Sequence, residues 1–181
     1  MSETNDDIYI GGKEKRDVII ENYNPKWKLK YQSHANNISK ALGNTALLIE
    51  HIGSTSVEGL AAKPIIDILV VVEDSSDETS YKQKMEDAGY VLYIREPDWY
   101  EHRMFRPPTK NANIHFYSEG CEEIQRVRVF RDWLRTHPND RLRYEKVKRE
   151  LAKQDWECLD DYAQAKTEVV ESIIAKACKP S

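Results

Sequence analysis

The residues best suited to chemistry lie between positions 50 and 72, where the chain reads EHIGSTSVEGLAAKPIIDILVVV. A turn made of Gly53, Ser54 and Thr55 follows one apolar run, and a single aspartate, Asp67, lies inside the next. The N–H groups and hydroxyls of such a turn can hold a phosphate, and a facing carboxylate can hold a divalent cation. This order of residues indicates the minimum equipment for chemistry on a nucleotide.

Each of these features also has a simpler structural interpretation. Gly53 reaches backbone angles that are closed to other residues, so the turn is either an anion cradle, strengthened if a helix begins near Thr55, or a plain strand-to-helix turn. An aspartate in so apolar a run is costly to bury alone. Asp67 therefore needs either Mg²⁺ or a buried ion pair with a base such as Lys63 or Arg103. Lys63 can equally reach a phosphate or lie in solvent.

Three further side chains are candidates for the same site. Arg103 is suited to bidentate binding of a phosphate, and His115, on a predicted strand, is either a structural hydrogen-bonding residue or a group that shares a face with Asp67. Lys166 interrupts an apolar helical stripe, so it either extends to the surface or points inward to neutralise a phosphate or Asp67. The predicted catalytic residues are Asp67 and His115. The predicted phosphate-binding or ligand-binding residues are Gly53, Ser54, Thr55, Lys63, Arg103 and Lys166.

A sheet is needed to hold these side chains. The apolar runs at 46–52 and 64–72 predict buried strands, the second being rich in Ile and Val. Weaker patterns predict strands at 90–94 and 112–117, on either side of a loop that contains three prolines. The candidate residues on the second and last of these strands share one face only if the two strands are neighbours.

Helical patterns surround the predicted strands. Asn24 and Pro25 have the residue types of a helix start, and apolar residues then recur at helical spacing up to Gly43. A shorter helix is predicted before 90–94. Beyond residue 120 the pattern is helical throughout, with a break at Pro138 and a last long helix over about 160–179.

The pattern therefore predicts one α/β (α+β) domain rather than two separable ones. Residues 1–16 are polar and charged and are predicted to form a loose tail. Residues 17–181 then form a single domain, with an α/β body over about 17–120 and a helical region over about 121–179. A chain of 181 residues is long enough to bury its own core.

Composition excludes several classes of protein. No apolar run approaches the roughly 20 residues that cross a bilayer, and the polar start lacks the pattern of a secretory signal, so we expect a cytoplasmic protein with no membrane contact. The cysteines, Cys121, Cys158 and Cys178, are odd in number and far apart, which predicts reduced thiols. A GxSxG elbow, a dinucleotide fingerprint and a Walker A loop are all absent from the sequence.

The charge of the chain is uneven. A net charge of −4 argues against general nucleic-acid binding. Between residues 122 and 153, however, ten Lys and Arg stand against six Asp and Glu. This basic segment is either a solvated helix face with ion pairs, a dimer contact, or an electrostatic rim for an anionic ligand.

Several segments, in the same order along the chain, resemble one known family. Besides EHIGSTSVEGLAAKPIIDI, they include NYNPKWKLKY, REPDWYEHRMFR, NIHFYSEGC and DYAQAKTEVVESI, and together they cover roughly residues 20–177. They are similar to the GrpB family, which is usually placed in the nucleotidyltransferase superfamily. The resemblance implies a mixed sheet flanked by helices, the superfamily's Gly-Ser turn at Gly53 and Ser54, and its first metal-binding carboxylate at Asp67.

One departure from the superfamily pattern divides the functional hypotheses. Superfamily catalysis typically uses a second acid two residues after the first, but Leu69 occupies that position, and His115 stands where a further carboxylate is expected. The first hypothesis is a nucleotidyltransferase-type pocket that binds a nucleotide or phosphorylated small molecule with Mg²⁺ and transfers a nucleotidyl group. The second is a catalytically silent ligand-binding or interaction module of the same fold. Nucleic-acid binding through the arginine-rich helices is the least favoured.

Overall fold

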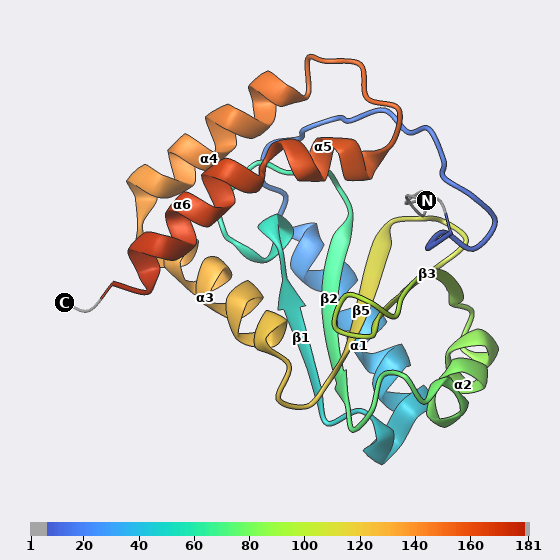
Figure 1. The fold of residues 1–181 in the computed structure, drawn as a ribbon. Coiled ribbons are helices and arrows are strands. Elements are labelled where there is room, and N and C mark those ends of the chain that lie inside the picture. The colour runs from blue at the N-terminus through green and yellow to red at the C-terminus, as the bar shows by residue number, and fades with distance from the viewer. Residues whose placement is uncertain (1–6, 180–181) are drawn as a thin grey trace.

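A five-stranded mixed sheet forms the centre of the protein (Figure 1). The computed structural model describes residues 7–179. The strand order is β1-β2-β5-β4-β3; β2 and β5 run parallel, and every other pair of neighbours is antiparallel. The strands are β1 (Leu48–Ile52), β2 (Ile66–Val72), β3 (Val91–Glu96), β4 (His102–Arg106) and β5 (Ala112–Ser118). This architecture confirms the predicted fold class, and β2 and β5 are indeed neighbours.

Helices flank this sheet and make up the C-terminal region. The first begins at the predicted place, because the Asn24 side chain accepts a hydrogen bond of 2.9 Å from the Lys26 N–H, and it ends where Gly43 takes a φ of 52°. The helices are α1 (Lys26–Leu42), α2 (Lys82–Asp87), α3 (Glu122–Thr136), α4 (Pro138–Leu151), α5 (Leu159–Ala165) and α6 (Thr167–Ala177).

Alternation along β2 divides the core into two layers. Ile66, Ile68, Val70 and Val72 point to one face, where they pack with Trp27 and other core residues of α1 and α2. The intervening residues point to the other face, where a second cluster packs against α3; it contains Ile52, Leu69, Val71 and Tyr117. Asp67 belongs to this second face by the same alternation.

The C-terminal helices pack on the loop that follows the glycine turn. Val57 and Leu60 are fully buried, in one cluster with Leu134 of α3, Tyr144 of α4 and Ile173 of α6. In Figure 1, α3, α4 and α6 stand beside the sheet and α5 lies across one end of it. Residues far apart in the sequence are thereby brought to the same end of β2.

Local structure differs from the sequence-based expectation at three points. Residues 102–106, expected in a loop, form the interior strand β4, because pairing with both β3 and β5 outweighs their charged composition. The predicted long last helix is divided into α5 and α6, with Lys166 at the junction. No α-helix starts near Thr55, since the turn is a single 3₁₀ turn, η2 (Ser54–Ser56).

The N-terminal segment follows the sheet edge. Tyr9 forms a β-bridge with Ile94 and is 8% exposed, in one cluster with Met104. This part of the predicted loose tail is therefore packed, whereas positions 1–6 lie outside the described residues. Within residues 7–179, no helix is both long and apolar enough to cross a membrane.

Candidate functional site

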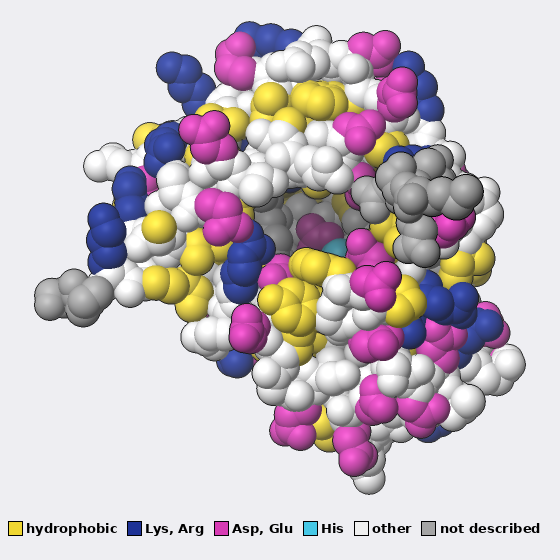
Figure 2. All heavy atoms as spheres, viewed as in Figure 1, with side chains coloured by type: hydrophobic (Ala, Val, Ile, Leu, Met, Phe, Trp, Pro, Cys, Tyr) yellow, Lys and Arg dark blue, Asp and Glu magenta, His cyan; other side chains and the backbone are white. Residues whose placement is uncertain are grey.

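Asp67 lies beside the glycine turn, and we call the space over its partly exposed carboxylate the hollow. Its side chain is 32% exposed although protein surrounds it, and Figure 2 shows this face hollowed near its centre, with acidic and histidine side chains at the bottom. Gly53 has a φ of +71°, and a Cβ built there would lie 2.6 Å from Asp67 Oδ2. Only glycine lets the turn approach the carboxylate this closely.

A chain of hydrogen bonds crosses four strands and ends at Asp67. Glu96 Oε2 lies 2.5 Å from His102 Nδ1, His102 Nε2 lies 3.0 Å from His115 Nδ1, and His115 Nε2 lies 3.2 Å from Asp67 Oδ1. These residues come from β3, β4, β5 and β2 respectively. Because strand neighbours are about 4.8 Å apart, ring-sized side chains on one face can bridge each step. We call these four residues the histidine chain.

Burial and hydrogen bonding set the charge of His102 and Asp67 within the histidine chain. Burial lowers the pKa of His102 to about 4, although the hydrogen bond to Glu96 acts in the opposite direction, so His102 is neutral at pH 7. A neutral imidazole donates through one nitrogen and accepts through the other, so His102 can link its two partners in the histidine chain. Burial alone would raise the pKa of Asp67, but the hydrogen bond and charge of His115, then Lys63 and Lys166, lower it.

Three lysines gather on the other side of Asp67. Lys63 and Lys166 lie 5.0 and 4.6 Å from the ring centre of Tyr162, and Lys148 lies 4.7 Å from that of Tyr144. Lys148 is 2% exposed and donates a hydrogen bond to the Ala61 carbonyl. We call Lys63, Lys148 and Lys166 the lysine cluster; its members come from the loop before β2, from α4 and from the junction of α5 and α6.

The charges of the lysine cluster are only partly balanced by Asp67 and Glu145. Within residues 7–179, none of its members lies within 4.0 Å of a carboxylate oxygen. Burial and then the Lys166 charge lower the pKa of Lys63 to about 7, and burial lowers that of Lys166 to about 8, while Asp67 raises both. Burial and the other two lysines lower the pKa of Lys148 well below its usual value. Such an arrangement favours an anion.

Hydroxyl groups accompany these lysines. The Tyr162 hydroxyl is buried and has no hydrogen-bond partner among the described residues. Burial raises the pKa of Tyr144 to about 12, against the effect of a hydrogen bond with Ser54. An unpartnered buried hydroxyl costs about 1–3 kcal/mol, which an accepting ligand oxygen would recover.

The glycine turn is fixed from both sides. Thr55 Oγ1 lies 2.9 Å from His51 Nε2, and the His51 ring stacks on Tyr31 of α1 with ring centres 4.6 Å apart. Ser56 Oγ donates a hydrogen bond of 2.5 Å to the Gly53 carbonyl. Burial lowers the pKa of His51 to about 4, so this contact is made by a neutral imidazole.

The structure does not bring Arg103 to this site. Its side chain lies on the opposite face of the sheet, where Nε donates to Glu78 at 2.7 Å and an Nη donates to Glu101 at 3.0 Å. At 4% exposure and with two carboxylate partners, it has no free donor directed at Asp67. Of the ion-pair partners considered for Asp67, Arg103 is therefore not one. Of the other predicted residues, His115 contacts Asp67 directly, Gly53 lies against its carboxylate, and Lys63 and Lys166 are near enough for their charges to lower its pKa.

The side chains around Asp67 do not fit a resident Mg²⁺. Magnesium prefers several oxygen ligands in octahedral geometry, and no group of three or more His, Cys, Asp or Glu within residues 7–179 could hold a metal. Leu69 is fully buried against α3. The neighbouring carboxylates are occupied, since Glu50 pairs with Arg128 and Arg131 at 3.0 and 2.8 Å. The Mg²⁺ expectation therefore stays a prediction, without support from this donor set.

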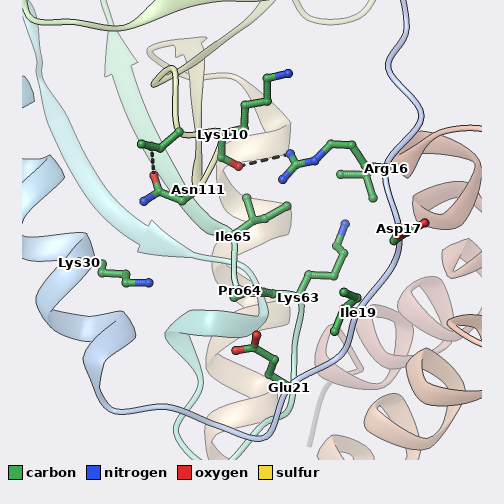
Figure 3. A pocket seen from close by; sticks show the side chains of 12 residues that line it. Arg16, Asp17, Ile19, Glu21, Lys30, Lys63, Pro64, Ile65, Lys110 and Asn111 are labelled. Atoms are coloured by element: carbon green, nitrogen blue, oxygen red, sulfur yellow. Dashed lines mark hydrogen bonds between the residues drawn. The ribbon is translucent and has the colours of Figure 1, made fainter.

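A separate cavity lies on the far side of Lys63. Its volume is about 420 Å³, and it contains Arg16, Lys110 and Asn111 as well as Lys63. Figure 3 shows the Lys63 amine directed into this space, with Arg16 bound to the Lys110 carbonyl at 3.3 Å. Asp67 does not line the cavity, so we place the chemistry in the hollow and regard the cavity as a neighbouring space that shares one lysine.

Sequence reasoning missed four residues of the site: Glu96, His102, Lys148 and Tyr162. Residues 102–106 read HRMFR, which does not alternate between polar and apolar, so nothing local marked His102 as a site residue. Lys148 sits among many other charged residues of α4, and nothing nearby in the sequence distinguishes it.

Comparison with known proteins assigns the chain to a family. Residues 17–176 match the model of the GrpB protein family. The chain belongs to the GrpB family. A UPF0157 protein of Halalkalibacterium halodurans is 49% identical over 160 residues, which is 88% of this chain and 82% of that protein. The resemblance of the sequence to GrpB is thereby confirmed.

A solved GrpB structure agrees with the fold. The crystal structure of conserved protein GrpB from Enterococcus faecalis has a TM-score of 0.78 and 33% sequence identity, and covers 88% of this GrpB chain and 96% of its own. A more distant relative is a dephospho-CoA kinase of Mycolicibacterium paratuberculosis, 27% identical over 168 residues, which is 78% of this chain and 41% of that protein.

Proposed function

We propose that the hollow over Asp67 binds a nucleotide or a similarly phosphorylated small molecule. The observation that carries the proposal is the lysine cluster, whose charges have no carboxylate partner within ion-pair distance among residues 7–179. Three lysine amines held together in a partly buried place repel one another when charged and lose hydration, which is why their pKa values are lowered. A phosphate would offset both effects, since it carries a charge of about −1.5 to −2 at pH 7 and three accepting oxygens.

Neutral donors complete the proposed phosphate site. Ser54 and Thr55 belong to the turn that Gly53 keeps close to Asp67, and Tyr162, whose ring contacts Lys63 and Lys166, adds an unpartnered buried hydroxyl from α5. Hydrogen bonds to charged oxygens are about twice as strong as those between neutral groups. One relative, of which this chain spans 41%, is named a dephospho-CoA kinase. A ligand that contains a nucleotide is compatible with that name.

Nucleotidyl transfer is the second candidate function, and the histidine chain favours it. A buried relay that joins Glu96 to Asp67 through two imidazoles can move protons at the edge of a phosphate site. In that case Asp67 and His115 would be the catalytic residues. Leu69 in place of a second acid argues against two-metal chemistry, so no step here passes through a metal ion. Release of pyrophosphate from a nucleoside triphosphate with an acceptor present would test this candidate.

Calorimetric titration with ATP tests the binding proposal. In EDTA, the wild-type protein should bind ATP, and Lys63→Met should weaken binding at least about tenfold, which corresponds to about 1.4 kcal/mol. Lys153→Met is the matched control, because the Lys153 side chain is 70% exposed and pairs with Glu150 at the surface of α4. Equal affinity of the wild type and Lys63→Met would contradict the proposal, as would no binding to the wild type.

Asp67→Asn separates a metal-free site from a magnesium site. Without a metal ion, the Asp67 carboxylate repels a bound phosphate, so the amide should strengthen ATP binding in EDTA. If Mg²⁺ bridges Asp67 and the phosphates, the same substitution should instead weaken binding when Mg²⁺ is present. The sign of the change therefore decides between the two forms of the site.

A further inference from the structure

An exposed aromatic pair stands beside the histidine chain. Trp99 and Tyr100 occupy the tip of the loop between β3 and β4 and are 41% and 44% exposed. The Trp99 ring meets His102 edge-on at 5.3 Å between ring centres and lies 5.9 Å from Tyr117. Tyr and Trp are enriched at binding interfaces, and neighbouring exposed apolar side chains rimmed by polar residues are typical of ligand-binding surfaces.

Trp99 lies about two strand spacings from Asp67 along the histidine chain. His102 stacks on His115 at 5.2 Å between ring centres, and His115 contacts Asp67 at 3.2 Å, while the Trp99 ring contacts His102. The row from β2 to β4 spans two strand spacings, about 10 Å. The charges of Lys63 and Lys166 act on Asp67 at one end of this row, and Trp99 stands at the other end.

The loop tip is held in a costly conformation. Tyr100 and Glu101 have φ values of 55° and 49°, a region that residues other than glycine rarely occupy. Glu101 is fixed from the opposite face of the sheet, because its carboxylate accepts from Arg103 at 3.0 Å and its carbonyl accepts from Ser75 Oγ at 2.9 Å. Arg103, which does not touch the hollow, thus anchors the loop that carries Trp99.

We propose that Trp99 is the stacking platform for the base of a nucleotide whose phosphates lie at the lysine cluster. This inference rests on the proposed phosphate site and specifies its ligand, since a sugar phosphate or pyrophosphate has no flat ring to place on Trp99. Base stacking on an aromatic side chain tolerates every base because each has a π-face. The site therefore takes nucleotides as a class, with selectivity among bases left to polar groups around the ring.

The experiment compares ADP with pyrophosphate, which carries the same two phosphates and no base. Calorimetry with Trp99→Ala should show ADP binding weakened roughly five- to a hundredfold and pyrophosphate binding unchanged. Trp99→Phe should keep most of the ADP affinity, because a phenyl ring still stacks. Leu142→Ala, which removes an exposed apolar side chain on α4, is the control for surface truncation and should change neither affinity.

Each outcome separates this inference from the proposed function. If Trp99→Ala binds ADP as tightly as the wild type, the stacking platform is refuted, while pyrophosphate binding that depends on Lys63 leaves the phosphate site intact. If the wild type binds neither ADP nor pyrophosphate, the proposed function and this inference both fail. Tryptophan fluorescence gives a second readout, since ADP should quench the wild type more than Trp99→Phe at saturation.

Discussion

The substitution Lys166→Met distinguishes a ligand-binding lysine from a structural one. Burial lowers the pKa of Lys166 from its usual 10.5 to about 8, against the attraction of Asp67. A pKa that is lower in the folded protein than in the unfolded protein means that folding disfavours the charged amine. At pH 7 the Lys166 amine is charged in both the folded and the unfolded protein. Each pH unit of such a difference is worth about 1.4 kcal/mol, so holding the charge costs the fold at most about 3 kcal/mol.

We therefore expect Lys166→Met to stabilise the ligand-free protein. A gain of about 1–3 kcal/mol in the free energy of unfolding corresponds to a rise of several degrees in Tm for a protein of this size. The same variant should lose affinity for ATP, because one of three phosphate-binding charges is gone. Urea denaturation and calorimetry measure the two effects separately. Functional sites that carry uncompensated charge show this opposition of stability and binding.

Lys176→Met is the matched control, with the opposite expected sign. Lys176 lies ten positions further along the chain, in α6, and its amine contacts Asp140 at 2.6 Å, where Asp140 is only 11% exposed. Removing this partner should destabilise the protein by about 1 kcal/mol without changing ATP affinity. If Lys166→Met also destabilises the protein and leaves ATP affinity unchanged, Lys166 is structural and the reasoning is refuted.

Three further predictions follow from the same site. In chemical denaturation, Gly53→Ala should destabilise the protein by more than about 2 kcal/mol and Gly59→Ala by about 1 kcal/mol. Both glycines have a positive φ, but only at Gly53 would a Cβ lie 2.6 Å from a carboxylate oxygen. Equal losses of stability in the two variants would contradict the close approach of the turn to Asp67. Because the pKa of Lys63 is lowered to about 7, the folded protein binds fewer protons than the unfolded protein between pH 7 and 10. In this range the free energy of unfolding without ligand should rise with pH, while the affinity for pyrophosphate should fall. If stability and affinity changed in the same direction, Lys63 would not be the phosphate-binding group. His102→Phe keeps the ring stacked on His115 but removes the hydrogen-bond partner of Glu96, so it should lower the free energy of unfolding in urea by about 1–3 kcal/mol. An unchanged free energy of unfolding would contradict the histidine chain.

The part of the site that could be predicted from sequence depends on local signals. Gly53 and Asp67 are recognisable because a glycine in a turn and one acid in an apolar strand are conspicuous within a few residues. Lys166 stood out for the same reason, as a charge in an apolar stripe. Each of these signals lies within a few neighbouring residues, so it can be recognised without knowing how the strands and helices pack.

Other parts required the register between strands. Arg103 was placed at the site because its residue type suits a phosphate, yet β4 pairs with β5 so that Arg103 faces away and His102 faces the hollow. A shift of one residue reverses every side chain of a strand, and pairing over long separations leaves no local trace. Lys148 joins the lysine cluster only because α4 packs on the loop after the turn.

A crystal structure of the protein soaked with ADP would locate the phosphates and the base of a bound nucleotide. We expect phosphate density within hydrogen-bond distance of Lys63 and Lys166, with the base against Trp99. ADP density confined to the cavity of about 420 Å³ beside Arg16 and Lys110 would contradict the proposed site. The absence of any ADP density over Asp67 at saturating ADP would contradict it as well.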